Sequence, residues 1–499
     1  MYRKEYTETI FRTGSHTSRK SSVKQHEMAA LREMEQMILA AEAVPAGAEA
    51  LERATAHLEQ FLQQVRQKRI LDEKQRAMEA FRQQFENGYT WRNGFLRNVA
   101  RFGDREALIE PESGTVWTYT QLNAEANRFS HALLRAGLQK GDVVMVQLHN
   151  CPEFVFAYLA CHKTGMVFCP VNFRLSAKEI TDCMDNSRPK VFLLEPETQA
   201  EVDMALRRTA HAPQILLTTD ARAAHAYAGF TADCPATEPE LPWELSVYDE
   251  TLRLFTSGTT GRQKSVCLTS INEVLSAHDV MIHFPFSFTD RSMNTTPWFH
   301  RGGLHSGGIT PTLYAGGTVI IQRKFQPEKT LDMVQQYGLT FLIGVPNVLE
   351  LLAEAQQKQP RDLSSLRGIV TMGSPLERAD CIRYQKILTK RIFNGYGTTE
   401  TFWNTFLRPD DLPEMAGSAG RSCVDDDVRV IKVYEDRVAE PDDLAATDGN
   451  EVGEVIIRSN AKSAAFYFGN PAETRRRFHD GFFYTNDLGT WDEIGRAHV

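Results

Sequence analysis

The chain has 499 residues, of which 42% are hydrophobic and 24% are charged, a globular composition that excludes wholesale disorder. The formal net charge is −8 at pH 7, which argues against nucleic acid as a general partner because nucleic-acid-binding domains usually carry a basic excess. No apolar run is long enough to span a bilayer, the N-terminus lacks the apolar segment of a secretory signal, and the eight cysteines form no CxxC pair. We therefore expect a reduced, cytoplasmic protein of several domains.

The first 90 residues differ from the rest of the chain in composition and in the spacing of their apolar residues. Residues 1–25 are polar and of mixed charge, which predicts a mobile tail. Residues 26–43 and 48–86 place apolar side chains at helical spacing around a break at Val44-Pro45-Ala46-Gly47, so 26–90 is predicted as a helical hairpin extension. Two interpretations stay open: a segment that self-associates or binds a partner through 26–86, or a helical cap on the main domain.

From residue 91 onward, short apolar runs alternate with helical segments. This alternation predicts βαβ units and parallel sheets, with strands near 143–148, 166–171, 190–194, 214–219, 318–322, 340–345 and 368–373. After about residue 420, the runs 428–435 and 454–459 predict a small antiparallel or barrel-like subdomain. The fold class is therefore α/β.

One segment, Leu254–Val266, combines features that suit a polyphosphate. Two glycines allow close backbone approach, four hydroxyls can donate hydrogen bonds, and a lysine supplies a compact cation: Gly258 and Gly261, Thr256, Ser257, Thr259 and Thr260, and Lys264. The common P-loop pattern is excluded because it requires glycine at Gln263. The alternative is an ordinary polar hairpin turn.

This loop resembles the [ST]SGTTGxPKG signature of the adenylate-forming superfamily, which includes acyl-CoA synthetases, luciferase-like enzymes and the adenylation domains of peptide synthetases. It departs at Gln263 and Ser265, where the family has Pro and Gly. Six further blocks resemble the family's in the same order, with Ser374 and Asn486 replacing the usual Ala and Gly: 163–180, 295–304, 368–376, 393–400, 417–423 and 480–493. The resemblance covers residues 93–493 and implies the family's large N-terminal domain, with two βαβ-type sheets flanked by helices and a β-barrel-like subdomain.

The resemblance also implies an activity. The chain is expected to be an acid–thiol ligase that uses ATP and Mg²⁺ to activate a carboxylic acid as an acyl-adenylate and then transfers the acyl group to CoA. Two alternatives remain: a stand-alone ligase that loads an acyl carrier protein, and a noncatalytic nucleotide-binding scaffold. A fatty, aryl, or small hydroxylated or branched acid remains open as substrate.

Residue roles follow by resemblance. The 256–261 loop and Lys264 would hold the β- and γ-phosphates, and Thr399 would contact the α-phosphate. Glu400 would bind Mg²⁺, Asp487 the ribose, and His300 would border the acyl pocket. The adenine slot would lie between two short runs, Gly373, Ser374 and Pro375 on one side and Asn394, Gly395, Tyr396 and Gly397 on the other.

For four of these residues a structural role is the alternative. Tyr396 could be a packed loop aromatic, Glu400 a helix-start residue, Asp487 an Asx-turn former and His300 a structural histidine. The acyl pocket itself is expected between residues 295–310 and the strand ends near 343–346 and 372–376. There Trp298 and Phe299 would form an apolar wall, and glycines would leave room for the acyl group.

The resemblance assigns residues 91–493 to the adenylation core. Members of the family continue into a mobile C-terminal domain that carries a lysine used in adenylation, whereas this sequence stops soon after the ribose block. We therefore expect that domain to be absent. The last residues, 494–499 (IGRAHV), resemble a translated sequencing adapter and are expected to be a non-native tail.

Overall fold

The computed structural model describes residues 47–256, 263–459, 462–492 and 496–498, together with Arg32 and Gln36. The chain divides into two units, Met1–Gln83 and Gln84–Val499. The predicted tail over 1–25 and the predicted helix over 26–43 lie outside the described residues.

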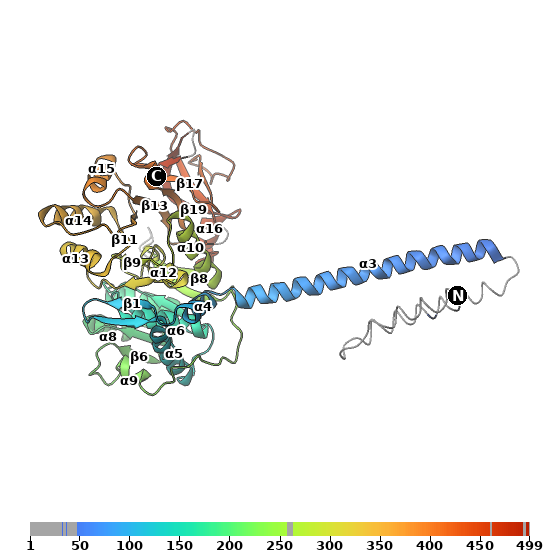
Figure 1. Cartoon of the computed structure of the whole chain (residues 1–499), viewed down its shortest axis with the longest axis horizontal. Helices are drawn as coiled ribbons and strands as arrows, with labels where there is room; N and C mark the ends of the chain where they lie inside the picture. The colour runs from blue at the N-terminus through green and yellow to red at the C-terminus, as the bar shows by residue number, and fades with distance from the viewer. Residues whose placement is uncertain are drawn as a thin grey trace. The chain divides into compact units, whose positions relative to one another are not determined.

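Helix α3 (Gly47–Gly88) occupies the range where the sequence predicts the longer helix (Figure 1). Several large apolar side chains along it are exposed, namely Ile70, Leu71, Met78 and Phe81. Because helices in proteins are stabilised mainly by packing of an apolar face, self-association through this segment stays a prediction. Among the described residues, no helix has the length and apolar character that a bilayer crossing requires.

The smaller sheet of the second unit has the strand order β6-β5-β3-β4-β7-β8 and is parallel except for β8. Its strands are β3 (Val143–Gln147), β4 (Val167–Pro170), β5 (Val191–Leu194), β6 (Ile215–Thr218), β7 (Glu250–Thr256) and β8 (Lys264–Thr269). Val144 and Val146 pack in a core with α5 (Tyr119–Arg135) and α6 (Pro152–Thr164), whereas Met145 packs with α7 (Ala177–Ser187) and α8 (Gln199–Leu206). Alternate side chains thus bury both faces, which explains the continuous apolar run.

The larger sheet contains six parallel strands in the order β1-β10-β9-β11-β12-β13. They are β1 (Glu106–Glu110), β9 (Arg291–Asn294), β10 (Thr318–Ile320), β11 (Phe341–Gly344), β12 (Gly368–Met372) and β13 (Ile392–Thr398). Antiparallel strands flank them: β2 (Thr115–Thr118) at one edge, and β14 (Phe402–Leu407) and β15 (Gly420–Ser422) at the other. Each expected strand from 143 to 373 is thereby present.

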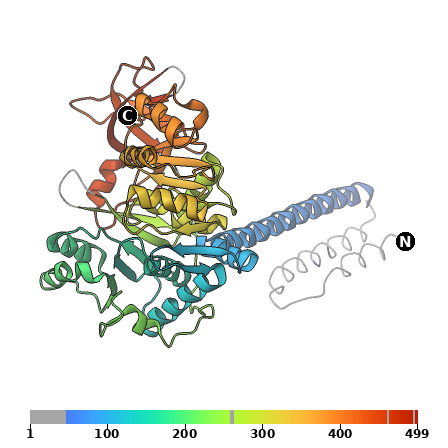
Figure 2. The ribbon, with the colours of Figure 1, turned by 60° about the vertical axis from the view of Figure 1, so that its left-hand side comes forward.

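Helices cover both faces of the larger sheet. Three of them pack side by side on one face (Figures 1 and 2), α13 (Pro327–Tyr337), α14 (Pro346–Lys358) and α15 (Arg378–Ile387). α10 (Ser270–His283) packs on the opposite face through Val280. The remaining described α-helices of this unit are α4 (Trp91–Phe102), α9 (Tyr227–Thr231), α11 (Arg301–His305), α12 (Ile309–Ala315) and α16 (Pro471–Arg477).

The C-terminal part of the chain forms the expected antiparallel subdomain. β16 (Asp427–Ile431), β17 (Gly453–Arg458) and β19 (Phe482–Trp491) are adjacent, and β18 (Phe478–His479) pairs with β19. β20 (Arg496–His498) pairs with both β15 and β19 and so joins this sheet to the larger one. All eight cysteines are free and buried.

Candidate nucleotide and acyl site

The predicted adenine slot lies where two neighbouring parallel strands end. Met372, the last residue of β12, is in register with Gly395 of β13, so the run Gly373–Pro375 follows directly beside the second predicted wall. Gly373 has a φ of +83°, a left-handed conformation that glycine adopts without strain. All three residues of this run are exposed. Carboxyl ends of parallel strands are the common ligand-binding edge of α/β sheets.

Residues of the second predicted wall of the adenine slot differ in burial and in their contacts. Asn394 is buried, and its side-chain oxygen accepts a hydrogen bond from Thr371 Oγ1 at 2.8 Å, so it joins the two strands. Tyr396 is half-buried, and its hydroxyl donates to Asp487 Oδ2 at 2.7 Å. Burial, together with the nearby Asp487 charge, raises the pKa of Tyr396, so the phenol is a stable donor. The predicted adenine and ribose residues are thus in direct contact.

Asp487 lies within strand β19, so its predicted alternative as an Asx-turn former is wrong. The preceding residue, Asn486, has a φ of +58°. That conformation explains why glycine is usual at this position and why asparagine, which tolerates it best among other residues, can replace it.

Thr399 and Glu400 lie in the tight turn between β13 and β14, so the helix-start alternative for Glu400 is also wrong. The Glu400 side chain is only 7% exposed, and its Oε1 accepts a hydrogen bond from Tyr467 at 2.6 Å. Its backbone carbonyl accepts from the Ala464 amide at 2.7 Å. Carboxylate oxygens are the ligands that a hard cation such as Mg²⁺ prefers, so Glu400 has the chemistry that its predicted role needs.

The predicted phosphate loop is described only at its two ends. Ser257, Gly258, Thr259, Thr260 and Gly261 lie outside the described residues, whereas Thr256 ends β7 and pairs with Lys264 at the start of β8.

At the described exit of this loop, Lys264 Nζ contacts Glu473 Oε1 at 2.5 Å and lies 5.3 Å from the centre of the Tyr467 ring. Tyr467 therefore contacts both the predicted phosphate cation, Lys264, and the predicted magnesium ligand, Glu400. The two ends of the expected triphosphate site converge on one side chain.

Both departures from the family loop signature have specific partners on α7. Cys183 Sγ donates to Gln263 Oε1 at 3.2 Å, and Ser265 Oγ donates to Asn186 Oδ1. Proline and glycine at positions 263 and 265 could make neither bond. The side chains that replace the family residues thus tie the exit of the loop to a helix.

His300 lies at the start of α11 and keeps an exposed edge, while its ring packs 4.1 Å from that of Phe299. Desolvation lowers the pKa of His300, which favours its neutral form. Phe299 in turn contacts Phe173 edge to face at 5.6 Å. His300 and these two rings form an aromatic surface beside the ends of β4 and β9.

Two expectations for the acyl pocket do not hold. Trp298 is 1% exposed and packs against Phe154 in the main core, so it is no exposed wall. Close packing requires glycine at 303, where a Cβ would lie 2.1 Å from the Pro297 carbonyl oxygen, and a Cβ at Gly302, 2.6 Å from Met372 Sδ, would displace that flexible side chain. The sequence indicated small residues here, but only the packing shows that protein atoms fill the space beside them.

A cationic cavity of about 480 Å³ opens next to the aromatic surface. It is lined by Phe173, Phe325, Asn150, Thr295 and Pro297, and by the basic residues His149, Arg174, Arg323 and Lys324. Beneath it, the buried Glu195 accepts hydrogen bonds from His149 Nδ1 (2.6 Å) and Arg323 (2.9 Å). Burial opposes ionisation of Glu195, but these two partners outweigh it and hold its pKa below the usual range. The cavity suits an anionic ligand.

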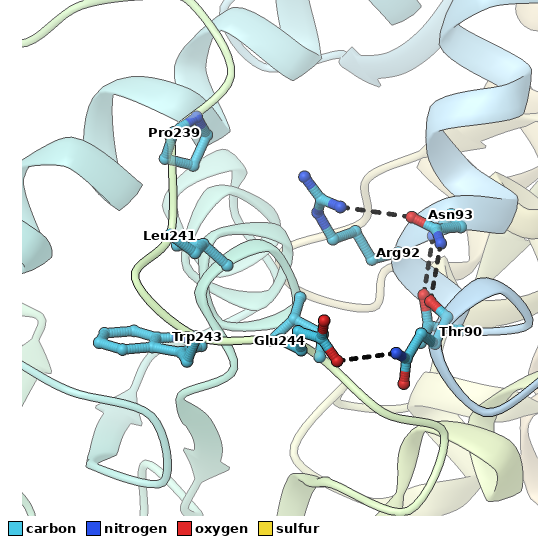
Figure 3. A pocket seen from close by; sticks show the side chains of 9 residues that line it. Thr90, Arg92, Asn93, Pro239, Leu241, Trp243 and Glu244 are labelled. Carbon is cyan, nitrogen blue, oxygen red and sulfur yellow. Dashed lines mark hydrogen bonds between the residues drawn. The ribbon is translucent and has the colours of Figure 1, made fainter. Parts of the chain in front are cut away.

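A second cavity, of about 300 Å³, lies between the 87–93 segment and the 239–245 segment (Figure 3). Asn87 donates to Glu244 at 2.9 Å across it, and Arg92 donates to Asn93 at 3.3 Å. None of the predicted site residues that the structure describes lines it.

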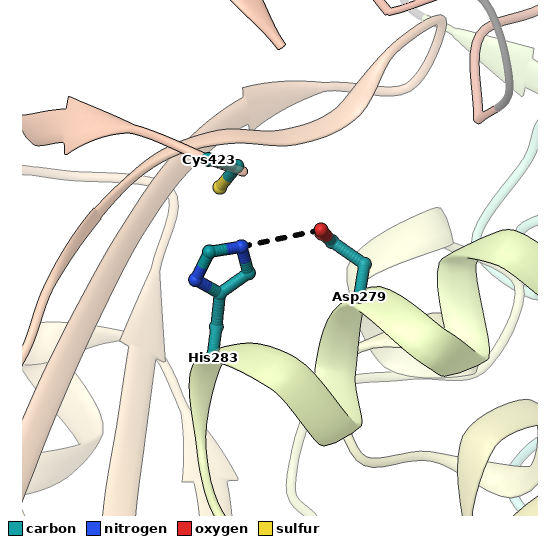
Figure 4. Close-up of side chains that lie close together, drawn as sticks. All are labelled: Asp279, His283 and Cys423. Atoms are coloured by element: carbon teal, nitrogen blue, oxygen red, sulfur yellow. Dashed lines mark ion pairs between the residues drawn. The ribbon is translucent and has the colours of Figure 1, made fainter. Parts of the chain in front are cut away.

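A buried group of side chains with metal-ligand chemistry does not fit a metal. Asp279, His283 and Cys423 lie close together (Figure 4). Arg408 donates to His283 Nδ1 at 2.6 Å, which leaves the proton of a neutral ring on Nε2, the nitrogen nearest Asp279. Lys462 already neutralises Asp279, with Nζ at 3.0 Å from Oδ2. Two of the three candidate ligands are therefore already paired with a cationic side chain, His283 with Arg408 and Asp279 with Lys462.

Sequence reasoning missed four residues whose contacts support the candidate site or the helices beside it. Tyr467 and Glu473 carry no local signal, because their roles depend on contacts with residues 67 and 209 positions away. Glu273 is fully buried on α10 and accepts from His305 at 2.6 Å and Tyr158 at 2.6 Å. Arg301 did have a signal: a charged residue directly after His300, within a block of glycine and apolar residues.

Comparison with known proteins identifies the family. The model of the AMP-binding enzyme family matches residues 95–467. The chain belongs to this family. It is an acid–thiol ligase of the AMP-forming acyl-CoA synthetase kind, with the α/β fold of the N-terminal domain of adenylate-forming enzymes.

Relatives with named activities cover most of the chain. A feruloyl-CoA synthase from Amycolatopsis sp is 31% identical over 404 residues, which are 79% of this chain and 76% of the relative. A fatty acid–[acyl-carrier-protein] ligase, ScoC, from Streptomyces coeruleorubidus is 29% identical and covers 77% of this chain and 72% of its own. The inhibitor-bound N-terminal domain of FACL13 from Mycobacterium tuberculosis superposes with a TM-score of 0.73 at 27% identity, over 82% of this chain and 98% of that domain.

Proposed function

We propose that the protein converts a carboxylic acid and ATP to an acyl-adenylate and pyrophosphate, and then transfers the acyl group to the thiol of CoA. In the first step a carboxylate oxygen attacks the α-phosphorus, and the bond to the bridging oxygen of the β-phosphate breaks. In the second, the thiol sulfur attacks the acyl carbon and AMP leaves. Such reactions need positioning and charge neutralisation more than covalent help.

The observation that carries the proposal is the position of Tyr467 between Lys264 and Glu400. A triphosphate needs a cation for its outer phosphates and, through Mg²⁺, a carboxylate close by. In this proposal Lys264 and the 256–261 loop bind the β- and γ-phosphates, and Glu400 holds Mg²⁺, which would neutralise phosphate charge. Thr399 contacts the α-phosphate, and Asp487, oriented by Tyr396, binds the ribose hydroxyls.

The adenine base is proposed to lie along the exposed run Gly373–Pro375, opposite Tyr396. His300 and the Phe299 ring border the reacting carboxylate. The neutral form of His300, favoured by its lowered pKa, adds no positive charge beside the substrate and can donate a hydrogen bond to it.

The cationic cavity supports CoA as the acceptor, because its basic side chains suit the phosphates of the CoA nucleotide, and its two phenylalanines suit a base. A carrier protein is the second candidate, since one relative is named as a ligase for an acyl carrier protein. Acidic surface on such a protein would suit the same basic residues.

The decisive experiment is ATP–pyrophosphate exchange by the 499-residue chain with a panel of aryl, arylacrylic, arylacetic and fatty acids. Exchange that requires one class of acid supports the ligase, and Glu400→Gln should abolish it. If nucleotide binds while no acid supports exchange, even when the lysine-bearing C-terminal domain of a relative is added, the noncatalytic scaffold is the better account. Product formation with free CoA, compared with a phosphopantetheinylated carrier protein, separates the two acceptors.

A further inference from the structure

Arg301 begins helix α11, and its side chain reaches two segments far away in the sequence. Nη1 donates to the Thr399 carbonyl oxygen at 2.6 Å, and Nη2 donates to the Lys462 carbonyl oxygen at 2.6 Å. Only 3% of the residue is exposed. A buried arginine thereby joins the segment of His300 to the turn that carries the predicted α-phosphate and magnesium ligands.

The geometry depends on the guanidinium group. Its planar fork can direct two N–H groups at two separate carbonyls, whereas a lysine ammonium at the end of a flexible chain has no such fixed geometry. Ser276 Oγ accepts a third, longer bond from Nη2 at 3.3 Å, and the Phe402 ring lies 5.4 Å from the guanidinium carbon. Contacts on several sides therefore fix the orientation of Arg301.

The charge of Arg301 is compensated as well. Burial lowers the pKa of Arg301 to about 10, against the raising effect of four carboxylates, Glu273, Glu400, Asp279 and Asp426. The residue therefore remains a cation at neutral pH. Its charge lies beside Glu400 while its hydrogen bond goes to the adjacent peptide group, so both position and charge act on the same turn.

We propose that Arg301 is a positioning residue for adenylation, which fixes the Thr399–Glu400 turn relative to the His300 segment. The inference rests on the proposed function, because it assumes that Thr399 meets the α-phosphate and that His300 borders the acid. Arg301 touches neither substrate. It sets the distance between the two segments that must bring the carboxylate to the phosphorus, where a shift of about 1 Å can cost about 100-fold in rate.

The test compares Arg301→Lys with a matched control, Arg367→Lys, in the 499-residue chain. Arg367 also bridges two partners, Asp290 and the Pro285 carbonyl, but it precedes β12, at the opposite end of that strand from Gly373. Acid-dependent ATP–pyrophosphate exchange gives kcat and KM. The ratio of exchange rates with the two α-phosphorothioate diastereomers of ATP reports which α-oxygen the protein contacts.

Arg301→Lys is expected to lower kcat by about 10- to 100-fold, to change KM for ATP by less than about threefold, and to relax the diastereomer preference. Arg367→Lys should keep the wild-type preference. A folded Arg301→Lys protein with wild-type kcat and preference overturns the inference. So does a loss of kcat that comes only with a lowered melting temperature and an unchanged preference, since that is a purely structural role.

If Arg301→Lys does not fold, Arg301→Gln carries the same test, because its amide keeps one donor nitrogen and removes the charge. The same relaxed preference is expected, and a retained preference overturns the inference. Failure of the proposed function looks different: the wild-type chain itself then shows no exchange with any acid, and the inference falls with it.

Discussion

The Tyr396 hydroxyl donates a hydrogen bond to Asp487 Oδ2 at 2.7 Å, although the two residues are 91 positions apart. One lies on β13 of the larger sheet and the other on β19 of the antiparallel subdomain. The bond joins the two parts of the protein that supply the proposed adenine and ribose contacts. It also leaves Asp487 with a fixed orientation before any nucleotide arrives.

Replacing Tyr396 with phenylalanine tests this preorganisation. Tyr396→Phe keeps the ring but removes the donor to Asp487, and we expect the Kd for ATP to rise about fivefold to tenfold, or ~1 to 1.5 kcal/mol. Isothermal titration calorimetry measures it. Tyr384→Phe is the matched control, because the hydroxyl of Tyr384 on α15 donates to Glu350 on α14 at 2.9 Å, away from the candidate site. An unchanged Kd for Tyr396→Phe would show that Asp487 needs no orientation.

The contact between Lys264 and Glu473 predicts a gain of affinity. In the free protein the Glu473 carboxylate forms an ion pair with Lys264, the lysine that is proposed to bind phosphates. Glu473→Gln removes that competing charge, and we expect ATP and pyrophosphate to bind about threefold to tenfold more tightly. Equilibrium dialysis with labelled ATP checks the change. Asp443→Asn, which breaks the exposed pair with Arg437, should leave binding unaltered; weaker binding by Glu473→Gln would contradict the argument.

The same pair predicts how stability depends on pH. Burial opposes ionisation of Glu473, but Lys264, Arg476 and Arg477 outweigh it and lower its pKa. A carboxyl whose pKa is lowered in the folded state stabilises the protein above its unfolded pKa of about 4.3 and loses that effect as pH falls through the folded value. The free energy of unfolding of the wild type should therefore be about 1 kcal/mol larger than that of Glu473→Gln at pH 6–8. This difference should shrink below about pH 4. Urea unfolding across pH measures this, and a difference that grew on acidification would refute it.

Glu273 is expected to be far more costly to replace. It is fully buried between His305, His162 and Tyr158, and although burial opposes its ionisation, the histidines hold its pKa well below the usual range. Glu273→Gln leaves donors that were arranged around a charge, so we expect a loss of about 3 kcal/mol at pH 7.5. Because the pKa of Glu273 is lowered, this loss should shrink as pH falls below about 4. Chemical unfolding measures the loss of stability for Glu273→Gln and for Glu350→Gln, where Glu350 is a partly exposed carboxylate. Equal losses of unfolding free energy would contradict the buried-charge explanation.

Ser265 offers a test of the departures in the loop. Ser265→Gly restores the family residue but removes the bond to Asn186 and adds backbone freedom, so we expect a loss of about 1–2 kcal/mol. Thermal unfolding measures it. In a double-mutant cycle with Asn186→Ala the two losses should be less than additive, because they break one interaction. Strict additivity would mean that Ser265 acts without Asn186.

Much of the architecture was predictable because it depends on local sequence patterns. Continuous apolar runs such as 143–148 fixed the buried parallel strands, since a strand covered on both faces needs apolar side chains at every position. The ordered blocks likewise identified the family, and they give Gly373, Tyr396 and Asp487 as proposed site residues. Each block is a short contiguous stretch of sequence. It can therefore be recognised without knowing which other segments it contacts in the fold.

The tertiary structure alone decided which of these blocks meet and what holds them. The contacts of Tyr467 with Glu400, of Glu473 with Lys264 and of Arg301 with Thr399 all join residues 67 or more positions apart. The tertiary structure also showed that Trp298 is buried in the core, whereas its position in the sequence had suggested that it forms a pocket wall. Periodicity reports which face of an element is apolar, but the partner of a buried charge or hydroxyl is set by chain crossings that no local pattern records.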